Sequence, residues 1–252
     1  MSELVFHEIP FKNKKVIFGK KTCHHAVSIT ECDGLRTMVF GHGMASEQSS
    51  IQLNNLEYHV FDYSILSMHS LLFCPNPSKV LVVGLGGGVI PRSLSKYCPD
   101  AKIDVIEIDE DVIDLAKEYF YFEETDNVKV YHDDAFNAVE KLDGKYDIVI
   151  LDAFNTSYTP MHLMSLQFFN RLKTILSDKS VVAINVCKTH PSYYSHVNTL
   201  TSSLGDDIYM LDGERNMYAS MLFSIQGNID LNKVPITDQI KKSIIHDIKA
   251  LN

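Results

Sequence analysis

The chain reads VLVVGLGGG from Val80 to Gly88, where a short apolar run passes directly into a glycine-rich turn. A helical pattern follows, beginning near Ile90. Glycine lets the backbone turn sharply and approach a ligand closely, and the first turn of a helix offers free N–H groups and the positive end of its dipole. The order of strand, glycine turn and helix therefore indicates a ligand site, although such a turn is weak evidence by itself.

From Lys79 onward, short apolar runs alternate with amphipathic helical segments. Runs that are apolar on both faces are typical of buried parallel strands, and strict alternation with helices predicts a doubly wound α/β sheet. The expected strands are Val80–Val83, Ile103–Ile106, Val128–Tyr131, Ile148–Leu151 and Val181–Val186. The expected helices between them are Ile90–Tyr97, Glu110–Tyr119, Phe136–Leu142 and Ser165–Leu176.

The end of the chain predicts two more strands and two helices. A helix near Tyr193–Leu204 precedes the runs Ile208–Leu211 and Tyr218–Ser224, which we expect to pair antiparallel and complete a mostly parallel, seven-stranded sheet. In the tail, Asp238–Leu251 places its apolar residues on one helical face.

The first 60 residues have a different pattern and predict a small β-module. Its expected strands are Leu4–Phe6, Val16–Phe18, His25–Thr30 and Leu35–Phe40, and Asp33-Gly34 between the last two is a hairpin signal. A helix over Tyr58–Phe73 then leads into the second unit and stops at Pro75-Asn76-Pro77. We thus expect an N-terminal β-hairpin module over residues 1–60 and a nucleoside-binding catalytic α/β domain over 61–252.

Composition excludes several classes of protein. The 252 residues carry a net charge of −9, which disfavours nucleic acid as a partner. Neither a run of eighteen apolar residues nor a signal peptide is present, so we expect a cytoplasmic protein without a membrane partner. The five cysteines form no C-x-x-C pair, and Cys23-His24-His25 with Cys32 has no second ligand pair at zinc-finger spacing, so we expect no metal.

Three carboxylates follow three of the expected strands. Glu107 lies twenty-one residues after Gly86, where an acidic residue is suited to bind ribose hydroxyls, and Asp134 and Asp152 follow the next two strands. Ligands of open α/β sheets bind outside the carboxyl ends of the strands, so these acids should converge on one crevice. A site ringed by acids suits a positively charged ligand such as a sulfonium nucleoside. Two of these acids have a structural alternative: Glu107 as a helix-capping acid, and Asp152 as a cap of the strand end or a partner of the backbone in the following loop.

These motifs resemble those of the spermidine synthase-like (polyamine aminopropyltransferase) family, a branch of the class I S-adenosylmethionine-dependent methyltransferase-like fold. The resemblance covers nearly the whole chain, including the β-module. It rests on Gln48-Ser49, Tyr63 followed by His69, Pro75-Asn76-Pro77, Gly84–Gly88, Glu107-Ile108-Asp109, Asp133-Asp134-Ala135 and Asp152-Ala153-Phe154.

The resemblance implies a role for each of these positions. Glu107 would hold the ribose, Asp134 with Ala135 the adenine, and the turn glycines Gly84, Gly86 and Gly88 the rest of the donor. Asp152 would be the catalytic carboxylate that takes the reacting amine. Tyr63 would assist Asp152, with a core aromatic as its structural alternative, and Gln48 would line the acceptor side, unless the loop aligns through Gln52 instead.

The resemblance also implies the reaction: transfer of an aminopropyl group from decarboxylated S-adenosylmethionine to a small cationic amine, by an enzyme that is often a homodimer. Two positions depart from the family pattern, because polyamine synthases have Asp where this chain has Gly87 and Asn155. Their loss removes two charge-assisted hydrogen bonds, each worth about 1.5–3 kcal/mol. Methyl or aminocarboxypropyl transfer from intact S-adenosylmethionine is therefore an alternative.

Two further alternatives belong to other classes of protein. One is a non-catalytic nucleoside-binding homologue, which would tolerate Asp152→Asn. The other is an NAD-linked reductase, which a glycine turn and a strand-end acid also fit but which leaves Asp134-Ala135 without a role. We also expect the segment Thr189–His196, with Tyr193, to shape the acceptor pocket, and we expect His162 and His190 to be solvated rather than catalytic.

Overall fold

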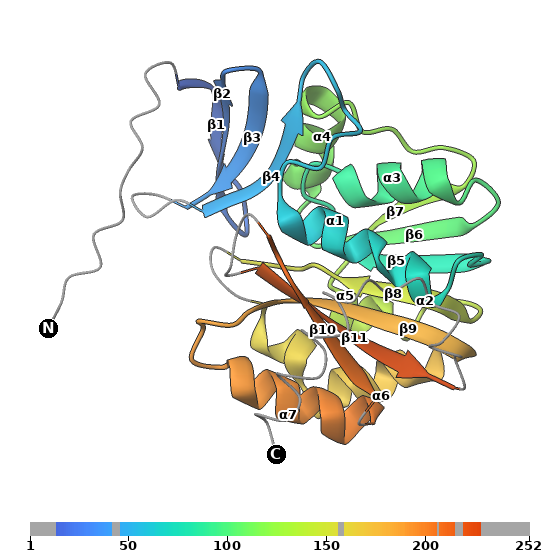
Figure 1. The fold of residues 1–252 in the computed structure, drawn as a ribbon. Coiled ribbons are helices and arrows are strands. Elements are labelled where there is room, and N and C mark those ends of the chain that lie inside the picture. Colours follow the sequence, from blue (N-terminus) through green and yellow to red (C-terminus); the bar gives the residue numbers. More distant parts are fainter. Residues whose placement is uncertain (1–13, 42–45, 156–158, 206, 215–218, 228–252) are drawn as a thin grey trace, which may run out of the picture.

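The computed structural model describes residues 14–41, 46–155, 159–205, 207–214 and 219–227. In these ranges the chain forms two sheets, a four-stranded antiparallel sheet and a seven-stranded, mostly parallel one with helices on both faces (Figure 1). The predicted strand Leu4–Phe6 and the predicted tail helix Asp238–Leu251 lie outside the described residues.

The N-terminal sheet has the strand order β1-β2-β3-β4 and contains β1 (Lys15–Lys21), β2 (Ala26–Cys32), β3 (Leu35–Phe40) and β4 (Ser46–Gln52). Asp33 and Gly34 have φ of 50° and 80°, as the two central residues of a tight hairpin turn require. Strand β4 was missed from the sequence because SEQSSIQ is polar, yet Ser49, Ser50 and Ile51 are buried in it.

The large sheet confirms the predicted doubly wound α/β fold. Its order is β10-β11-β9-β8-β5-β6-β7, and the five strands from β5 to β9 run parallel. The strands are β5 (Lys79–Val83), β6 (Lys102–Glu107), β7 (Val128–His132), β8 (Tyr146–Leu151), β9 (Leu176–Cys187), β10 (Ile208–Asp212) and β11 (Ala219–Gln226). The chain order reverses beside β5, which places a crevice at the carboxyl ends of β5, β6 and β8.

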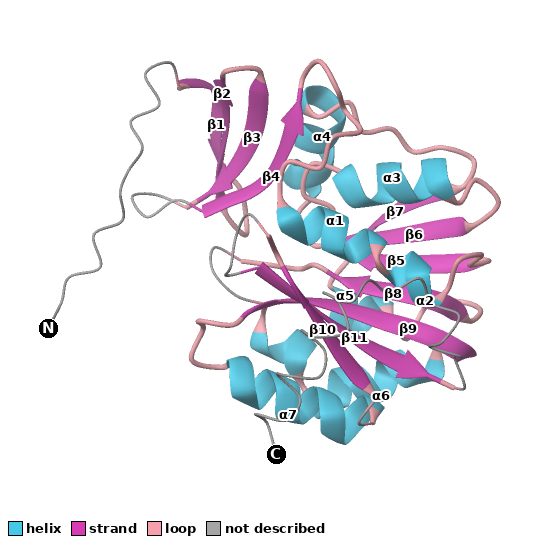
Figure 2. Cartoon of the chain, viewed as in Figure 1, coloured by secondary structure: helices cyan, strands magenta, loops and turns pink. Residues whose placement is uncertain are grey.

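Two layers of helices cover this sheet (Figure 2). One face carries α1 (Asp62–Met68), α2 (Ser70–Phe73), α3 (Val89–Tyr97) and α4 (Glu110–Tyr119); the other carries α5 (Ala135–Ala138), the 3-10 helix η1 (Met161–Met164), α6 (Leu166–Thr174) and α7 (Tyr193–Leu204). The helix predicted over Tyr58–Phe73 begins only at Asp62 and breaks at His69, whose N–H bonds to Leu66 O three residues back. The helix predicted over Phe136–Leu142 is a single turn.

The N-terminal sheet packs against α4 and the first turn of α3, so it stands over the carboxyl ends of β5 and β6. The hydrophobic core between the two contains Val27, Ile29, Met38, Phe40 and Ile51 from the small sheet and Val89, Val112, Leu115 and Phe120 from the large unit. The boundary at residues 60 and 61 stays a prediction.

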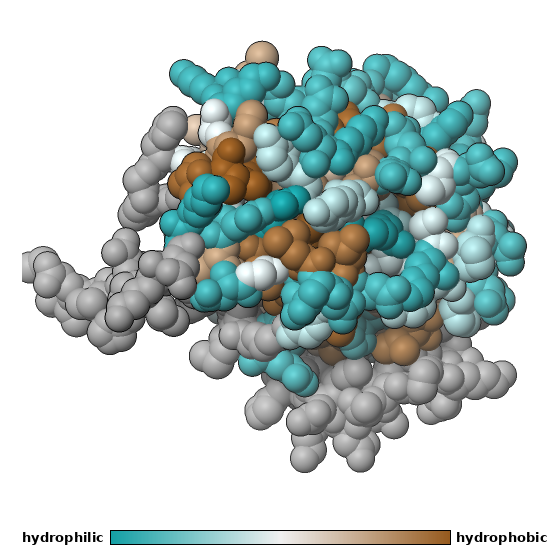
Figure 3. Space-filling view, turned by 90° about the horizontal axis from the view of Figure 1, so that it is seen from above, coloured by the Kyte–Doolittle hydropathy of each residue, from teal (hydrophilic) through white to brown (hydrophobic). Residues whose placement is uncertain are grey.

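Seen from above, apolar side chains form separate patches among hydrophilic ones (Figure 3). Of the helices in the described ranges, none combines the length and apolar character needed to cross a bilayer.

Candidate active site

A cavity of about 510 Å³ opens at the carboxyl ends of the central strands, within the size range typical of small-molecule sites. Residues of both sheets line it. Of the residues proposed from the sequence, eight are on its wall: Gln48, Tyr63, Gly84, Gly86, Glu107, Asp134, Ala135 and Asp152. The structure thus brings together side chains that are more than one hundred residues apart in the chain.

Glu107 joins the glycine turn to the start of α4. Its Oε2 accepts from Leu85 N at 2.9 Å and its Oε1 accepts from Asp109 N at 3.1 Å. Burial raises the pKa of Glu107, and the backbone N–H groups that donate to it act in the opposite direction. The side chain that caps α4 is Asp109, which accepts from Asp111 N, so Glu107 does not have the helix-capping role considered for it.

Asp134 caps the short helix α5, because its Oδ1 accepts from Phe136 N at 2.9 Å. His162 Nε2 from η1 lies 3.3 Å from the same oxygen. Asp134 thus has a helix-capping role that was not considered for it from the sequence, and Asp134 and Ala135 also line the cavity. His162 lines the cavity as well, although in the sequence nothing separates it from a solvated loop histidine.

Asp152 stands just beyond β8 and is held by a residue that the sequence reasoning missed. Asn185 Nδ2, on the neighbouring strand β9, donates to Asp152 Oδ1 at 2.8 Å. The pKa of Asp152 is raised to about 7: burial raises it most, the Asn185 donor acts against this, and the charge of Glu107 contributes to the rise. Asn185 is the one strongly polar side chain in the apolar run Val181–Val186, and this was the signal available in the sequence.

Tyr63 is placed by α1 so that its hydroxyl donates to Gln48 O at 2.8 Å. Burial, followed by the charge of Asp152, raises the pKa of the Tyr63 phenol far above its ordinary value, while a hydrogen bond with Ser49 lowers it. The phenol therefore stays protonated and acts as a hydrogen-bond donor. Gln48 lines the cavity, whereas Gln52 is not on its wall, which favours the first of the two alignments considered.

The glycine turn has little room for side chains. A Cβ on Gly84, where φ is +98°, would lie 2.3 Å from Asp152 O, so glycine is required for the turn to pass the end of β8. Gly86 lines the cavity. Gly88, expected on the donor side, does not: it precedes α3, and a Cβ there would lie 2.4 Å from the Phe122 ring.

The two departures from the family pattern lie in different surroundings. Asn155 lines the cavity, but Gly87 does not. A Cβ on Gly87 would lie 2.7 Å from Phe120 Cδ1 and 2.8 Å from Ser49 Oγ. An aspartate at this position would therefore require both neighbours to move.

Two further features of the site were not anticipated. His24 and His25, from the turn between β1 and β2, line the cavity, and the His25 ring stacks on Phe40 with a centroid distance of 4.1 Å. Burial lowers the pKa of His25, so its ring is neutral near pH 7. Tyr193, expected at the acceptor pocket, is instead a buried residue at the start of α7, and its hydroxyl donates to Met210 Sδ at 3.2 Å.

The charge of the cavity wall is strongly one-sided. Its acidic residues are Glu47, Glu107, Asp133, Asp134 and Asp152. Among the described residues on the wall there is no lysine or arginine. Such a wall attracts cationic groups and offers no lysine or arginine to a carboxylate or phosphate.

Comparison with known proteins assigns the chain to a family. The family model for the spermine/spermidine synthase domain matches residues 61–207, more than half of the chain. The chain belongs to the spermine/spermidine synthase domain family. The resemblance inferred from the motifs is confirmed, and the matched region contains every proposed site residue except Gln48.

Relatives of this spermine/spermidine synthase domain protein include two kinds of transferase. The polyamine aminopropyltransferase of Vibrio vulnificus is 38% identical over 149 residues, covering 58% of this chain and 50% of the relative. The chain thus spans about half the length of that protein. The eEF1A lysine and N-terminal methyltransferase of Mus musculus is 30% identical over 128 residues, covering 46% of this chain and 18% of the relative.

A solved structure shares the fold of this family member. It is a spermidine synthase in complex with the transition-state analogue AdoDATO, and it superposes with a TM-score of 0.71 at 19% identity. The superposition covers 94% of this chain and 89% of the other, so it includes the N-terminal sheet as well as the large unit.

Proposed function

We propose that this protein is an aminopropyltransferase that uses decarboxylated S-adenosylmethionine as donor and a small cationic amine as acceptor. The observation that carries the proposal is the cavity wall, which has five carboxylates and no lysine or arginine among its described residues. The decarboxylated donor and the amine are both cationic, whereas intact S-adenosylmethionine has a carboxylate for which the described part of this wall offers no lysine or arginine. The aminopropyltransferase from Vibrio vulnificus and the spermidine synthase with AdoDATO support the same reaction.

In the proposed donor site, Glu107 accepts hydrogen bonds from the ribose hydroxyls and Asp134 from the adenine amino group. Gly84 and Gly86 allow the donor to lie against the backbone of the turn. Because Glu107 already accepts from Leu85 N and Asp109 N, its carboxylate is held in place before the donor binds.

In the proposed reaction, the acceptor nitrogen attacks the propyl carbon next to the sulfonium sulfur. A C–N bond forms while the C–S bond breaks, and its electron pair goes to sulfur, which leaves in the neutral thioether 5′-methylthioadenosine. An ammonium has no free lone pair, so its extra proton must be removed, and the Asp152 carboxylate is suited to take it. Tyr63 keeps its proton and helps to orient the amine.

The test of this proposal is a donor comparison. Purified protein is incubated with putrescine-like diamines and either decarboxylated or intact S-adenosylmethionine, and products are measured by mass spectrometry. We expect 5′-methylthioadenosine and an aminopropylated amine from the decarboxylated donor. S-adenosylhomocysteine from the intact donor would establish methyl transfer instead, and binding of neither nucleoside would overturn both assignments.

The pH dependence follows from the raised pKa of Asp152. The carboxylate is the active form, so kcat/KM should rise with pH through about 7 and level off above it. At pH 6 we expect about one tenth of the plateau value. A bound sulfonium favours the carboxylate, so the acid limb of kcat should lie at lower pH than that of kcat/KM. Initial rates between pH 5.5 and 9 check this, and a flat profile would contradict it.

Asn185 provides a second prediction at the same carboxylate. In Asn185→Ala the donor to Asp152 Oδ1 is lost, so the pKa of Asp152 should rise and the acid limb of kcat/KM should move to higher pH. We expect kcat/KM at pH 7 to fall about tenfold, as for loss of one hydrogen bond to a charged group. Rate profiles check this, with Asn198→Ala on the exposed face of α7 as the matched control. A lower rate with an unmoved limb would show that Asn185 has no effect on proton transfer.

Methyl transfer is the second candidate function, and one observation favours it. Gly87 carries no carboxylate, and Phe120 and Ser49 fill the space where one would lie. A donor carboxylate would therefore meet less repulsion here than in a polyamine synthase. The methyltransferase relative from Mus musculus agrees with this alternative.

A further inference from the structure

The turn between β1 and β2 brings the N-terminal sheet to the wall of the cavity. This turn, residues 22–25, carries His24 and His25, both of which line the cavity. Thr22 N donates to His25 O at 2.8 Å and closes the turn. The location of the turn therefore decides where two imidazole rings stand over the site.

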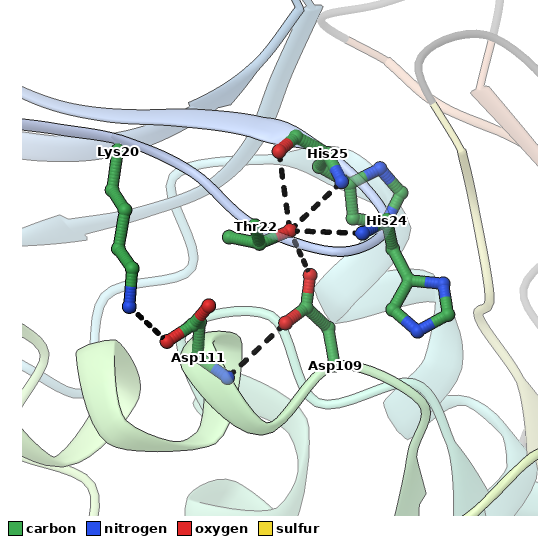
Figure 4. A network of polar contacts seen from close by, with 6 residues as sticks. All are labelled: Lys20, Thr22, His24, His25, Asp109 and Asp111. Carbon is green, nitrogen blue, oxygen red and sulfur yellow. Dashed lines mark hydrogen bonds and ion pairs between the residues drawn. The ribbon is translucent and has the colours of Figure 1, made fainter.

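The hydroxyl of Thr22 holds the turn together and attaches it to the large unit (Figure 4). Thr22 Oγ1 accepts from His24 N at 3.1 Å and from His25 N at 2.8 Å, and it donates to Asp109 Oδ2 at 2.5 Å. The carboxylate is a stronger acceptor for the single hydroxyl proton than the His25 carbonyl, which lies 3.1 Å away. Because Thr22 is buried, water does not readily replace these contacts.

Asp109 connects this turn to the proposed donor site. Its side chain is 2% exposed, with Oδ1 bound to Asp111 N and Oδ2 to Thr22. Its backbone N–H donates to Glu107 Oε1, and Glu107 Oε2 accepts from Leu85 N in the glycine turn. A continuous series of hydrogen bonds thus runs from the glycine turn through Glu107 and Asp109 to the histidines.

A second polar contact, beside the first, is suited to serve as its control. Lys20 Nζ lies 2.5 Å from Asp111 Oδ1 on the outer side of the same helix end (Figure 4). Lys20 is half-exposed and is not on the wall of the cavity at the carboxyl ends of the strands. An exposed pair of this kind contributes little to stability. Lys20 and Thr22 therefore attach the same strand end to the same helix, but only Thr22 reaches the residues that line the site.

We propose that Thr22 is a positioning residue for the donor: its hydroxyl ties the His24–His25 turn of the N-terminal sheet to the strand end that carries Glu107, so that the turn forms part of the donor site. This inference rests on the proposed use of an adenosyl donor but not on which group is transferred. Without the hydroxyl, Asp109 loses a buried partner and the two histidine N–H groups lose their acceptor. The turn then no longer holds its place over the nucleoside.

The test is donor binding in variants that differ by one hydroxyl. Calorimetric titration with 5′-methylthioadenosine and with decarboxylated S-adenosylmethionine is made on the wild type, Thr22→Val, Thr22→Ser and Lys20→Met. We expect Thr22→Val to raise both Kd values about tenfold, Thr22→Ser to restore them, and Lys20→Met to leave them within about twofold. Equal affinity in Thr22→Val and the wild type would overturn the inference, as would equal losses in Thr22→Val and Lys20→Met.

A measurement on the wild type keeps the test independent of how well the variant folds. The amides of His24 and His25 should exchange more slowly with deuterium when 5′-methylthioadenosine is bound, because the turn is then held between nucleoside and Asp109. Unchanged exchange at both amides would overturn the inference. Failure of the wild type to bind either adenosyl compound would overturn the proposed donor itself, whereas binding without an effect of Thr22→Val overturns only the role of Thr22.

Discussion

Asp152→Asn is expected to lower kcat by about a thousandfold, within the range typical of a lost general base, while the donor Kd stays within about threefold of the wild type. Asparagine keeps the size of the side chain and still accepts from Asn185 Nδ2 through its own carbonyl. It cannot take a proton from an ammonium. The donor contacts proposed for Glu107 and Asp134 are unchanged, so binding and chemistry should separate in this variant.

Two measurements check this result: calorimetric titration for donor binding and single-turnover mass spectrometry for transfer. Asp126→Asn, in an exposed loop, is the matched control and should behave like the wild type. If Asp152→Asn transfers the group at the wild-type rate, Asp152 is not the base. If neither protein transfers any group although both bind the nucleoside, the chain is the non-catalytic homologue considered from the sequence.

The large sheet was predictable because the local sequence of each buried strand is enough to identify it. Runs such as Val80–Val83 and Ile148–Leu151 are apolar on both faces, as expected for central parallel strands covered on both sides by helices. The convergence of Glu107, Asp134 and Asp152 on one cavity followed from the same reasoning, since the carboxyl ends of parallel strands meet at one edge.

The parts that escaped prediction depend on contacts between segments far apart in the chain. Strand β4 is polar, and it is buried because β3 pairs with it and the apolar side of the sheet packs on α4. Asn185 is visible in the sequence as a polar residue in an apolar run, but its role depends on Asp152 at the end of the neighbouring strand. Gly88 resembles the other turn glycines in sequence, but the Phe122 ring packs against it.

The N-terminal half of the cavity was the least visible in the sequence. From the sequence, His24 and His25 were weighed as metal ligands with Cys23 and Cys32 and assigned instead to a β-hairpin, with no role at the site. Their location depends on Thr22 and Asp109, which are 87 residues apart. No local sequence pattern marks a side chain that one unit contributes to a site on another. Glu107 and Asp134 could be identified because each follows a strand that the sequence predicts.

Glu107→Gln is expected to raise the donor Kd about a hundredfold, which corresponds to one strong or two ordinary hydrogen bonds to a charged group. The glutamine has one acceptor oxygen in place of two. The glutamine therefore cannot accept from both Leu85 N and Asp109 N, and it has no charged oxygen to accept from the ribose hydroxyls. The same change loosens the connection between the glycine turn and α4. Titration with 5′-methylthioadenosine measures this loss directly, because this nucleoside has the ribose but neither the aminopropyl group nor the sulfonium charge of the donor.

The fold should survive this substitution, which separates donor binding from stability. Burial opposes the charge of Glu107, so the neutral glutamine relieves a cost while it leaves one N–H without its acceptor. These effects are opposite in sign, and we expect the free energy of unfolding to change by less than about 2 kcal/mol. Glu110→Gln, exposed in the first turn of α4, is the matched control and should keep the wild-type Kd. A normal Kd in Glu107→Gln would contradict the ribose role and would leave the carboxylate with only its bonds to the backbone.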